Sequence, residues 1–263
     1  MYGIRMLIRP TGGLTFRRLP GSILHIGSYT FVPPTTLSGF LRRLVMMLAA
    51  GPSLDLAAFV KHQETEREMY VLPRDLIPVG AYTGDSGHWV HTTKRQGIRD
   101  FKHDAFSRLY RVAAEKEVYQ LHDWDYLMCE DLTGYLLGKK EECLSPLLGL
   151  GNRGCKLGKE GYAFIADITG PTQYRLIDTT EVPSTIVPGR LLAGHPCDAF
   201  QVYRHDWTDG PDGGLFSPSP SPVRGFVPFM AGLTETPLKA EYYTDGTTFI
   251  PKALVDILQG EVV

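Results

Sequence analysis

The sequence predicts an α+β fold that is rich in strands and contains one inserted segment. Apolar residues alternate with polar ones near the start of the chain and again near residue 165, as in strands buried on one face. Between these stretches, apolar residues recur at the spacing of an amphipathic helix. The predicted segments are a strand at 2–8, an extended run at 22–32, a helix at 35–50, strands at 68–79 and 117–128, a short helix at 131–137 and a strand at 162–168. Their order is a β-α-β-β-α-β-like layout with an insertion.

The first strand and the first helix give the strongest signals. Ile4, Met6 and Ile8 share one face of the strand. The apolar stripe of the helix consists of Leu37, Phe40, Leu41, Leu44, Val45 and Leu48. Thr35 or Thr36 is the expected N-cap, because a hydroxyl there can accept a hydrogen bond from a first-turn amide. Arg42 and Arg43 fall away from the stripe, so we expect them to be solvated or to face a partner.

A change of composition after Gly170-Pro171 divides the chain. We expect one domain at residues 1–170, with an insertion at about 82–117, and a smaller, mostly-β region at 171–263. The expected elements of that smaller region are strands at 185–192, 200–205 and 225–229, a linker rich in proline and glycine at 209–222, and a short helix at 252–258.

The composition is that of a globular protein, with 43% hydrophobic and 21% charged residues. The net charge of -2 means that the distribution of charge must decide whether the chain binds nucleic acid. Four separate cysteines indicate reduced thiols, and His88 and His91 have no ligand partners at metal-site spacing. We therefore expect no metal and no cofactor. Because the sequence shows no signal peptide and its longest apolar run is short, a cytoplasmic location is expected, with no membrane contact.

The most basic part of the chain lies between residues 88 and 111. Its cations are Lys94, Arg95, Arg99, Lys102, Arg108 and Arg111, and Trp89, Phe101, Phe106 and Tyr110 are interleaved with them. Cations neutralise phosphates and aromatic rings stack on unpaired bases, so this segment is a candidate for gripping RNA. A solvated surface face is the alternative.

A glycine-rich turn at residues 149–158 is the second candidate. Its glycines allow backbone amides to approach a phosphate closely, and Arg153, Lys156 and Lys159 would supply charge. The turn lacks the lysine-serine or lysine-threonine pair of a P-loop and the spacing of a dinucleotide fingerprint. A hairpin loop without a binding role is the alternative.

Three landmarks occur in a specific order. They are a first strand followed by an extended basic segment, the stretch YTFVPPTTLSGFL at 29–41 that opens the first helix, and PLLG at 146–149 followed by Arg153 and Cys155. Together they resemble the CRISPR-associated RAMP superfamily, and specifically the Cas five family, whose members cap the crRNA-bound Cascade complex. The resemblance covers about the first two-thirds of the chain.

The resemblance implies a ferredoxin-like (RRM-like) domain with a projecting β-hairpin thumb, here the basic insertion. It also implies a role in antiviral defence, in which the chain binds the 5′ handle of the guide RNA. The implied partners are the backbone RAMP subunit and the large subunit, with target DNA near its PAM-proximal end as a further candidate. The expected RNA-binding residues are Arg17, Arg18, Tyr29, Arg42, Lys94, Arg95, Arg99, Lys102, Arg108, Gly149, Gly151, Asn152, Arg153, Gly154 and Lys156.

Other functions remain open from the sequence. Some members of this family cleave the guide precursor with a late-helix tyrosine and a lysine-histidine pair. Here Val45 holds the tyrosine's position, and no such pair follows Glu117, so we expect binding without catalysis. The alternatives are a metal-independent endoribonuclease using His91, Lys102 or His103, the related handle-binding subunit of a type III complex, and a protein-interaction domain without an RNA role.

Overall fold

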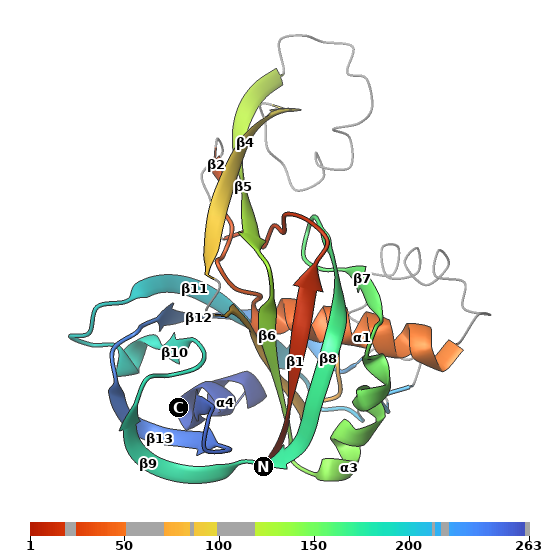
Figure 1. Ribbon diagram of the computed structural model, residues 1–263, viewed down its shortest axis with the longest axis vertical. Coiled ribbons are helices and arrows are strands. Elements are labelled where there is room, and N and C mark those ends of the chain that lie inside the picture. Colours follow the sequence, from red (N-terminus) through yellow and green to blue (C-terminus); the bar gives the residue numbers. More distant parts are fainter. Residues whose placement is uncertain are drawn as a thin grey trace.

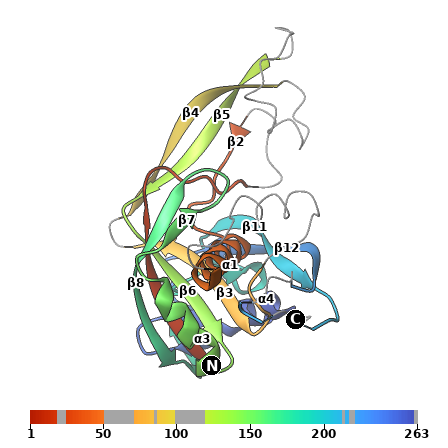
Figure 2. The same cartoon turned by 90° about the vertical axis from the view of Figure 1, so that its right-hand side faces the viewer.

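The computed structural model describes residues 1–18, 25–50, 71–84, 87–98, 119–211, 214–216 and 221–260. Its main sheet has five strands in the order β3-β6-β1-β8-β7 and curls around the helix α1 (Figures 1 and 2). The bounds are β1 Tyr2–Pro10, β3 Leu76–Thr83, β6 Leu132–Gly138, β7 Gly154–Lys156, β8 Tyr162–Gln173 and α1 Pro34–Ala50. All neighbouring strands of this sheet are antiparallel.

The predicted first strand and first helix are confirmed, and together they build the core. Ile4, Met6 and Ile8 are all buried on the face of β1 that the period-two pattern indicates. The apolar stripe of α1 packs on the same side, and Leu37, Leu41 and Leu44 are fully buried. The strand predicted at 162–168 is also confirmed and is longer than expected.

The expected N-cap of α1 is wrong, because the helix begins earlier. Pro34 occupies its first turn, and the amide of Leu37 already donates to the carbonyl of Pro33 at 2.9 Å. Proline suits this position because its fixed φ is helical and the amide that it lacks would have no partner inside the helix. Thr35 and Thr36 therefore lie within the first turn, where both are only partly buried.

A long two-stranded hairpin projects from the main sheet (Figure 1). It consists of β4 His88–Ile98 and β5 Tyr119–Cys129, which pair in register from His88 with Cys129 to Ile98 with Tyr119. The two-residue strand β2 His25–Ile26 adds to β5 in parallel. Arg99, Lys102, His103 and Arg108 belong to the stretch between the two strands and lie outside the described residues.

The short helix predicted at 131–137 is wrong, because this segment forms the strand β6. Its Leu132, Leu136 and Leu137 are buried between β1 and β3, so pairing with two strands outweighs the local helical preference. Asp131, just before this strand, accepts a hydrogen bond from Arg9 Nε at 2.8 Å. The helical turns lie further on, as α3 Glu141–Leu144 and the 3₁₀ helix η4 Ser145–Leu150.

The C-terminal part forms two three-stranded sheets around the helix α4 Lys252–Gln259 (Figure 1). One has the order β10-β12-β11, with β10 Val187–Pro188, β11 Asp198–Trp207 and β12 Val223–Leu233. The other has the order β14-β13-β9, with β9 Arg175–Glu181, β13 Leu238–Thr244 and β14 Phe249–Pro251. The strands predicted at 200–205 and 225–229 and the helix at 252–258 are confirmed.

The strand predicted at 185–192 is wrong for most of its length. Only β10 pairs there, and the 3₁₀ helix η5 Gly189–Leu191 follows it. Residues 212–213 and 217–220 of the predicted linker lie outside the described residues.

One hydrophobic cluster joins the two parts of the chain. It includes Ile4 and Leu41 from the main sheet and α1, and Val202 and Leu254 from the C-terminal sheets and α4. The strand β11 thereby lies against α1, which brings the two parts together at the start of that helix. Among the helices of the described residues, none combines the length and the apolar character that crossing a bilayer needs. The fold is thus α+β and mostly β, as the sequence predicts.

Candidate nucleic-acid interface

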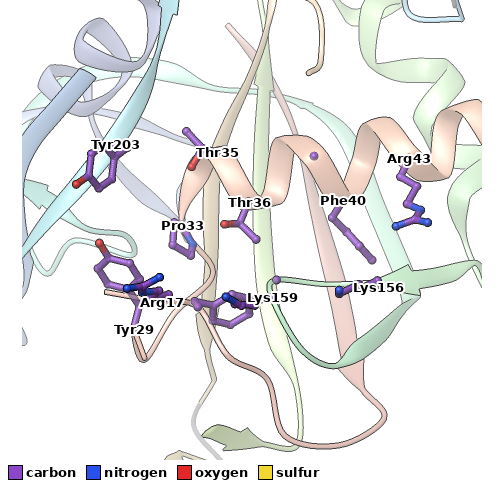
Figure 3. A pocket seen from close by; sticks show the side chains of 13 residues that line it. Arg17, Tyr29, Pro33, Thr35, Thr36, Phe40, Arg43, Lys156, Lys159 and Tyr203 are labelled. Carbon is purple, nitrogen blue, oxygen red and sulfur yellow. The ribbon is translucent and has the colours of Figure 1, made fainter. Parts of the chain in front are cut away.

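A pocket of about 390 Å³ lies against the first turns of α1 (Figure 3). We call it the cationic pocket. Its lining residues are Phe16, Arg17, Tyr29, Pro33, Thr35, Thr36, Gly39, Phe40, Arg43, Lys156, Gly158, Lys159 and Tyr203. They come from the segments before and after β2, from α1, from β7 and the turn after it, and from β11. Three stretches of the chain that are far apart in sequence, at 16–43, 156–159 and 203, therefore converge on one site.

Four of these lining side chains are cations and none is a carboxylate. Arg17 and Lys159 lie beside the start of α1, and Arg43 and Lys156 lie one to two turns further along the helix (Figure 3). Four positive charges facing one cavity repel each other unless an anion enters it. The pocket is therefore built to attract a ligand with more than one negative charge.

The electrostatics of Lys159 follow from its surroundings. Burial, reinforced by the positive charge of Arg17, lowers the pKa of Lys159 to about 8. Burial also lowers the pKa of Arg17. Glu160 raises the pKa of Lys159 in part, and its carboxylate accepts hydrogen bonds from Arg95 at 2.7 Å and Tyr126 at 2.8 Å. A bound phosphate would favour the charged form of Lys159 and raise its pKa.

The helix α1 contributes its positive end to the same cavity. The first amides of a helix have no acceptor within the helix, and its dipole favours an anion at this end. The hydroxyls of Thr35 and Thr36 stand at this end, and Thr36 is directed towards the cavity between Lys159 and Phe40 (Figure 3). The threonine hydroxyls and the positive end of the helix dipole therefore lie at the same cavity as the four cations.

Gly39 opens the middle of the pocket. It is exposed, and a Cβ added to it would meet nothing within 4 Å. Glycine within a helix costs roughly 1 kcal/mol relative to alanine, and no neighbouring atom requires it here. The missing side chain leaves bare helix backbone on the pocket wall, where a ligand can approach closely.

Two tyrosines close the end of the pocket near β11. The hydroxyl of Tyr29 donates to the backbone carbonyl of Gln201, so this ring joins the segment before α1 to β11. The hydroxyl of Tyr203 accepts a hydrogen bond from Gln201 Nε2 at 2.6 Å. Tyr29 is only 4% exposed, whereas Tyr203 is half-buried and can present part of its ring to a ligand.

The glycine-rich turn contributes less of its length than the sequence suggests. Of its expected residues, only Lys156 lines the cationic pocket, together with Gly158 and Lys159 from its end. Arg153 is exposed and its Nε donates to the carbonyl of Gly149 at 3.3 Å. Asn152 takes a φ of 60°, and a Cβ on Gly154 would lie 2.7 Å from the carbonyl of Ala163. These residues determine the conformation of the turn, and this conformation places Lys156 and Lys159 at the cationic pocket.

Other expected residues lie outside the cationic pocket. The guanidinium of Arg18 lies 5.0 Å from the centroid of the Phe200 ring. Lys94 pairs with Asp123 at 3.2 Å on the projecting hairpin. Arg95 pairs with Glu160 and lies 4.9 Å from the centroid of the Trp124 ring. Gly151 also lies outside the lining, next to Asn152.

The expectation that Arg42 is solvated or faces a partner is wrong. It is 1% exposed, and its Nη1 donates to the backbone carbonyls of Gly214 and Leu215. The segment around Leu215 covers this side of α1, which the periodicity of the helix alone cannot reveal. Arg42 therefore has a structural role, and we do not include it in the RNA surface.

Several residues that line the cationic pocket were not among the expected RNA-binding residues, although the helical periodicity of the sequence points to three of them. Thr36, Gly39 and Arg43 recur at helical spacing and share one polar face of α1. Lys159 was expected to supply charge but was not among the expected contacts. Tyr203 has no comparable signal, because only the packing of β11 against α1 brings it to the pocket.

The neighbours Arg42 and Arg43 give a matched pair of variants. Arg42→Ala should lower the free energy of unfolding by about 2–4 kcal/mol, because it removes a fully buried side chain together with its hydrogen bonds to two backbone carbonyls. Arg43→Ala should leave that free energy within about 0.5 kcal/mol and weaken RNA binding instead. Chemical denaturation and RNA titration of both variants check this. Equal effects of the two variants on stability would contradict the assignment.

Comparisons with known proteins give similarities of fold. No family model matches the sequence, and a search of curated proteins finds no relative. A chain of the Type III-B Cmr-beta structure bound to cognate target RNA and AMPPnP is 10% identical over 98% of this chain and 90% of that chain, with a TM-score of 0.43. A CRISPR protein from Archaeoglobus fulgidus is 12% identical over 94% of this chain and 97% of that one, with a TM-score of 0.43. A chain of a CRISPR RNA-guided surveillance complex is 11% identical over 98% and 99%, with a TM-score of 0.32, so the structural neighbours of this chain include several CRISPR-associated proteins.

Proposed function

We propose that this chain is a non-catalytic subunit of a type I CRISPR Cascade effector complex that binds the 5′ handle of the crRNA in antiviral defence. One observation carries the proposal. The stretch 29–41, which resembles the helix entry of the Cas five family, supplies nearly half of the lining of the cationic pocket, with Tyr29, Pro33, Thr35, Thr36, Gly39 and Phe40. The motif and the anion-binding geometry therefore coincide.

A polynucleotide fits this pocket better than a small anion. The cations fall into two pairs along α1, Arg17 with Lys159 and Lys156 with Arg43, as successive phosphates of one strand would require (Figure 3). Tyr203, which is half-buried, brings an aromatic ring beside these pairs. Unpaired nucleotides are held by this combination of cations and aromatic rings.

The arrangement of strands supports the ferredoxin-like assignment. The elements β1, α1, β3, β6, the turns α3 and η4, and β8 follow one another in β-α-β-β-α-β order, and their sheet is antiparallel with the order β3-β6-β1-β8. We propose that these elements form the RRM-like domain and that the hairpin of β4 and β5 is the inserted thumb. Its exposed Trp89 and Leu121 suit contacts with the backbone RAMP subunit and the large subunit.

The absence of catalysis is also part of the proposal. At the position where cleaving members carry a tyrosine, Val45 is 1% exposed and packed in the core, so this place cannot present a reacting group to RNA. His91 lies exposed on β4. No specific observation on the described residues favours the endoribonuclease alternative over binding.

Titration of the purified chain with fluorescein-labelled repeat RNA at several salt concentrations tests the function. Four phosphate contacts to a single strand should give a slope of about -3 in a plot of log affinity against log salt. The labelled RNA should stay intact during prolonged incubation with a chelator. A slope near zero, or no binding at all, would contradict the RNA role. Specific cleavage that His91→Ala or His103→Ala abolishes would favour the endoribonuclease.

A further inference from the structure

An exposed row of side chains lies on the sheet next to the cationic pocket. Along β12, alternate residues Arg224, Phe226, Pro228 and Met230 are exposed, and Phe226 and Met230 keep 51% and 54% of their surface in solvent. Large apolar side chains are rarely left so open on a strand without a partner. We call Phe226, Pro228 and Met230 the β12 row.

The pairing of β11 with β12 connects this row to the pocket. Tyr203 lies opposite Pro228, Gln201 lies opposite Met230, and His205 lies opposite Phe226. Residues that face each other across an antiparallel pair point to the same side of the sheet, about 5 Å apart. The His205 and Phe226 rings confirm this, with centroids 5.7 Å apart. Since Tyr203 also lines the cationic pocket, the pocket and the row form one continuous surface.

We propose that the β12 row is a stacking track for unpaired bases of the RNA strand whose phosphates occupy the cationic pocket. This inference rests on the proposed function and specifies the path of the strand beyond the pocket. Tyr203 receives the first base at the rim, and Phe226 and Met230 receive bases on either side of Pro228. Alternate residues of a strand are about 6.6 Å apart, so the row from Phe226 to Met230 is about 13 Å long and accommodates two unstacked bases.

The chemistry of the row suits bases. A phenyl ring, a proline ring and a thioether offer flat or polarizable apolar contacts, and stacking on them is tolerant of sequence because every base has a π-face. Gln201 and Tyr203 add an amide and a hydroxyl at the edge of the row, linked by their 2.6 Å hydrogen bond. Arg224 ends the row as a cation 3.9 Å from Asp206, a long contact between two partly exposed side chains. A phosphate can compete with that carboxylate for the arginine.

Photocrosslinking and affinity measurements together test the track. The probe is an oligouridylate that carries fluorescein and a single 5-iodouridine, placed at successive positions in a series of oligonucleotides. At some positions the crosslink should map to Tyr203, Phe226 or Met230 by peptide mass spectrometry. Phe226→Ala should weaken binding by at least about 5-fold, whereas Phe226→Tyr should retain it, because stacking on one aromatic ring contributes on this scale. Leu176→Ala, which removes another exposed apolar side chain on β9, should leave the affinity unchanged.

The salt dependence separates this inference from the proposed function. Phe226→Ala and Met230→Ala should lower the affinity without changing the salt slope, because they remove no phosphate contact. If both variants bind RNA as the parent does and no crosslink maps to the row, the track is wrong while the handle-binding proposal stands. The same conclusion follows if these variants bind RNA normally and instead lose association with another subunit of the complex. If the parent chain binds no RNA, the proposed function itself fails.

Discussion

Replacing Arg17 and Lys159 together by alanine should weaken binding of single-stranded RNA by about 100-fold or more, the largest loss expected for any two substitutions of single charges in this chain. Each charge-assisted hydrogen bond to a phosphate in a partly buried site contributes about 1.5–3 kcal/mol, and the two side chains act on the same end of the pocket. The salt slope should fall in magnitude by about 1.4, because two phosphate contacts disappear. Fluorescence anisotropy over a salt series measures both quantities.

The matched control variant also removes two positive charges, but from positions outside the cationic pocket. Lys139 and Lys239 are both exposed and lie outside the cationic pocket. Their double alanine variant should bind RNA within about 3-fold of the parent, because neither substitution removes a charge that lines the pocket. If the control weakens binding as much as the pocket variant, the chain attracts RNA through its general surface charge and the pocket assignment is wrong.

The lowered pKa of Lys159 adds a pH signature to the same site. In the free protein Lys159 loses its proton near pH 8, while a bound phosphate favours the charged form and raises the pKa. The affinity for RNA should therefore be highest below pH 8, where Lys159 is charged. Above pH 8 it should fall by up to about 10-fold per pH unit. Lys159→Arg, whose guanidinium stays charged, should bind at pH 7 and remove this fall. A fall of equal size in Lys159→Arg would assign the titration to another group.

The charge of Lys159 should destabilise the folded protein when no RNA is bound. Its pKa in the folded chain lies below the ordinary value of 10.5, so the unfolded chain binds more protons between about pH 8 and 10.5 and stability rises with pH across that window. Replacing Lys159 by methionine removes the buried charge and its repulsion from Arg17. A variant that is more stable at pH 7 and binds RNA more weakly is the pattern expected of a binding residue.

The sequence predicts the elements whose periodicity is set by one buried face. The strand β1 and the helix α1 each bury a single stripe, and for both the pattern identified the core residues correctly. The strand β6 was mistaken for a helix because it is buried on both sides, so Leu132, Leu136 and Leu137 show no alternation. The strands β9 and β13 were missed because their patterns are short and mixed, and both large apolar residues of β9, Leu176 and Ile177, stay exposed.

The candidate site was predictable in its chemistry and only partly in its residues. The sequence indicated an anion site at the glycine-rich turn, and the structure brings Lys156 and Lys159 from that turn to Arg17 and the start of α1. Arg42 and Arg43 were indistinguishable in sequence. Only the segment at Gly214 and Leu215, distant in the chain, covers one of them and leaves the other at the pocket. Long-range packing therefore decides which cations are available to a ligand.

Replacing Gly39 by tryptophan should abolish RNA binding while the fold is retained. The position lies within α1, is exposed, and has open space where a side chain would start, so a large residue would extend into the cationic pocket and occupy the path of the strand. Tryptophan has a better helix propensity than glycine, so the helix itself should not be destabilised. We expect a loss of affinity of about 100-fold or more, because the substitution excludes the strand from all four cations at once.

The variant Gly39→Ala tests whether tryptophan acts by filling the pocket or simply by replacing a glycine in the helix. A methyl group meets no atom within 4 Å and replaces the weakest ordinary helix former, so this variant should gain about 1 kcal/mol, which is about 2–4 °C in Tm. It should keep most of the RNA affinity. A chain that binds RNA normally with tryptophan at this position would place the RNA elsewhere, whatever the cations contribute. If alanine weakens binding as strongly as tryptophan, the strand contacts the bare backbone of α1 directly, and the glycine is then required for contact as well as for space.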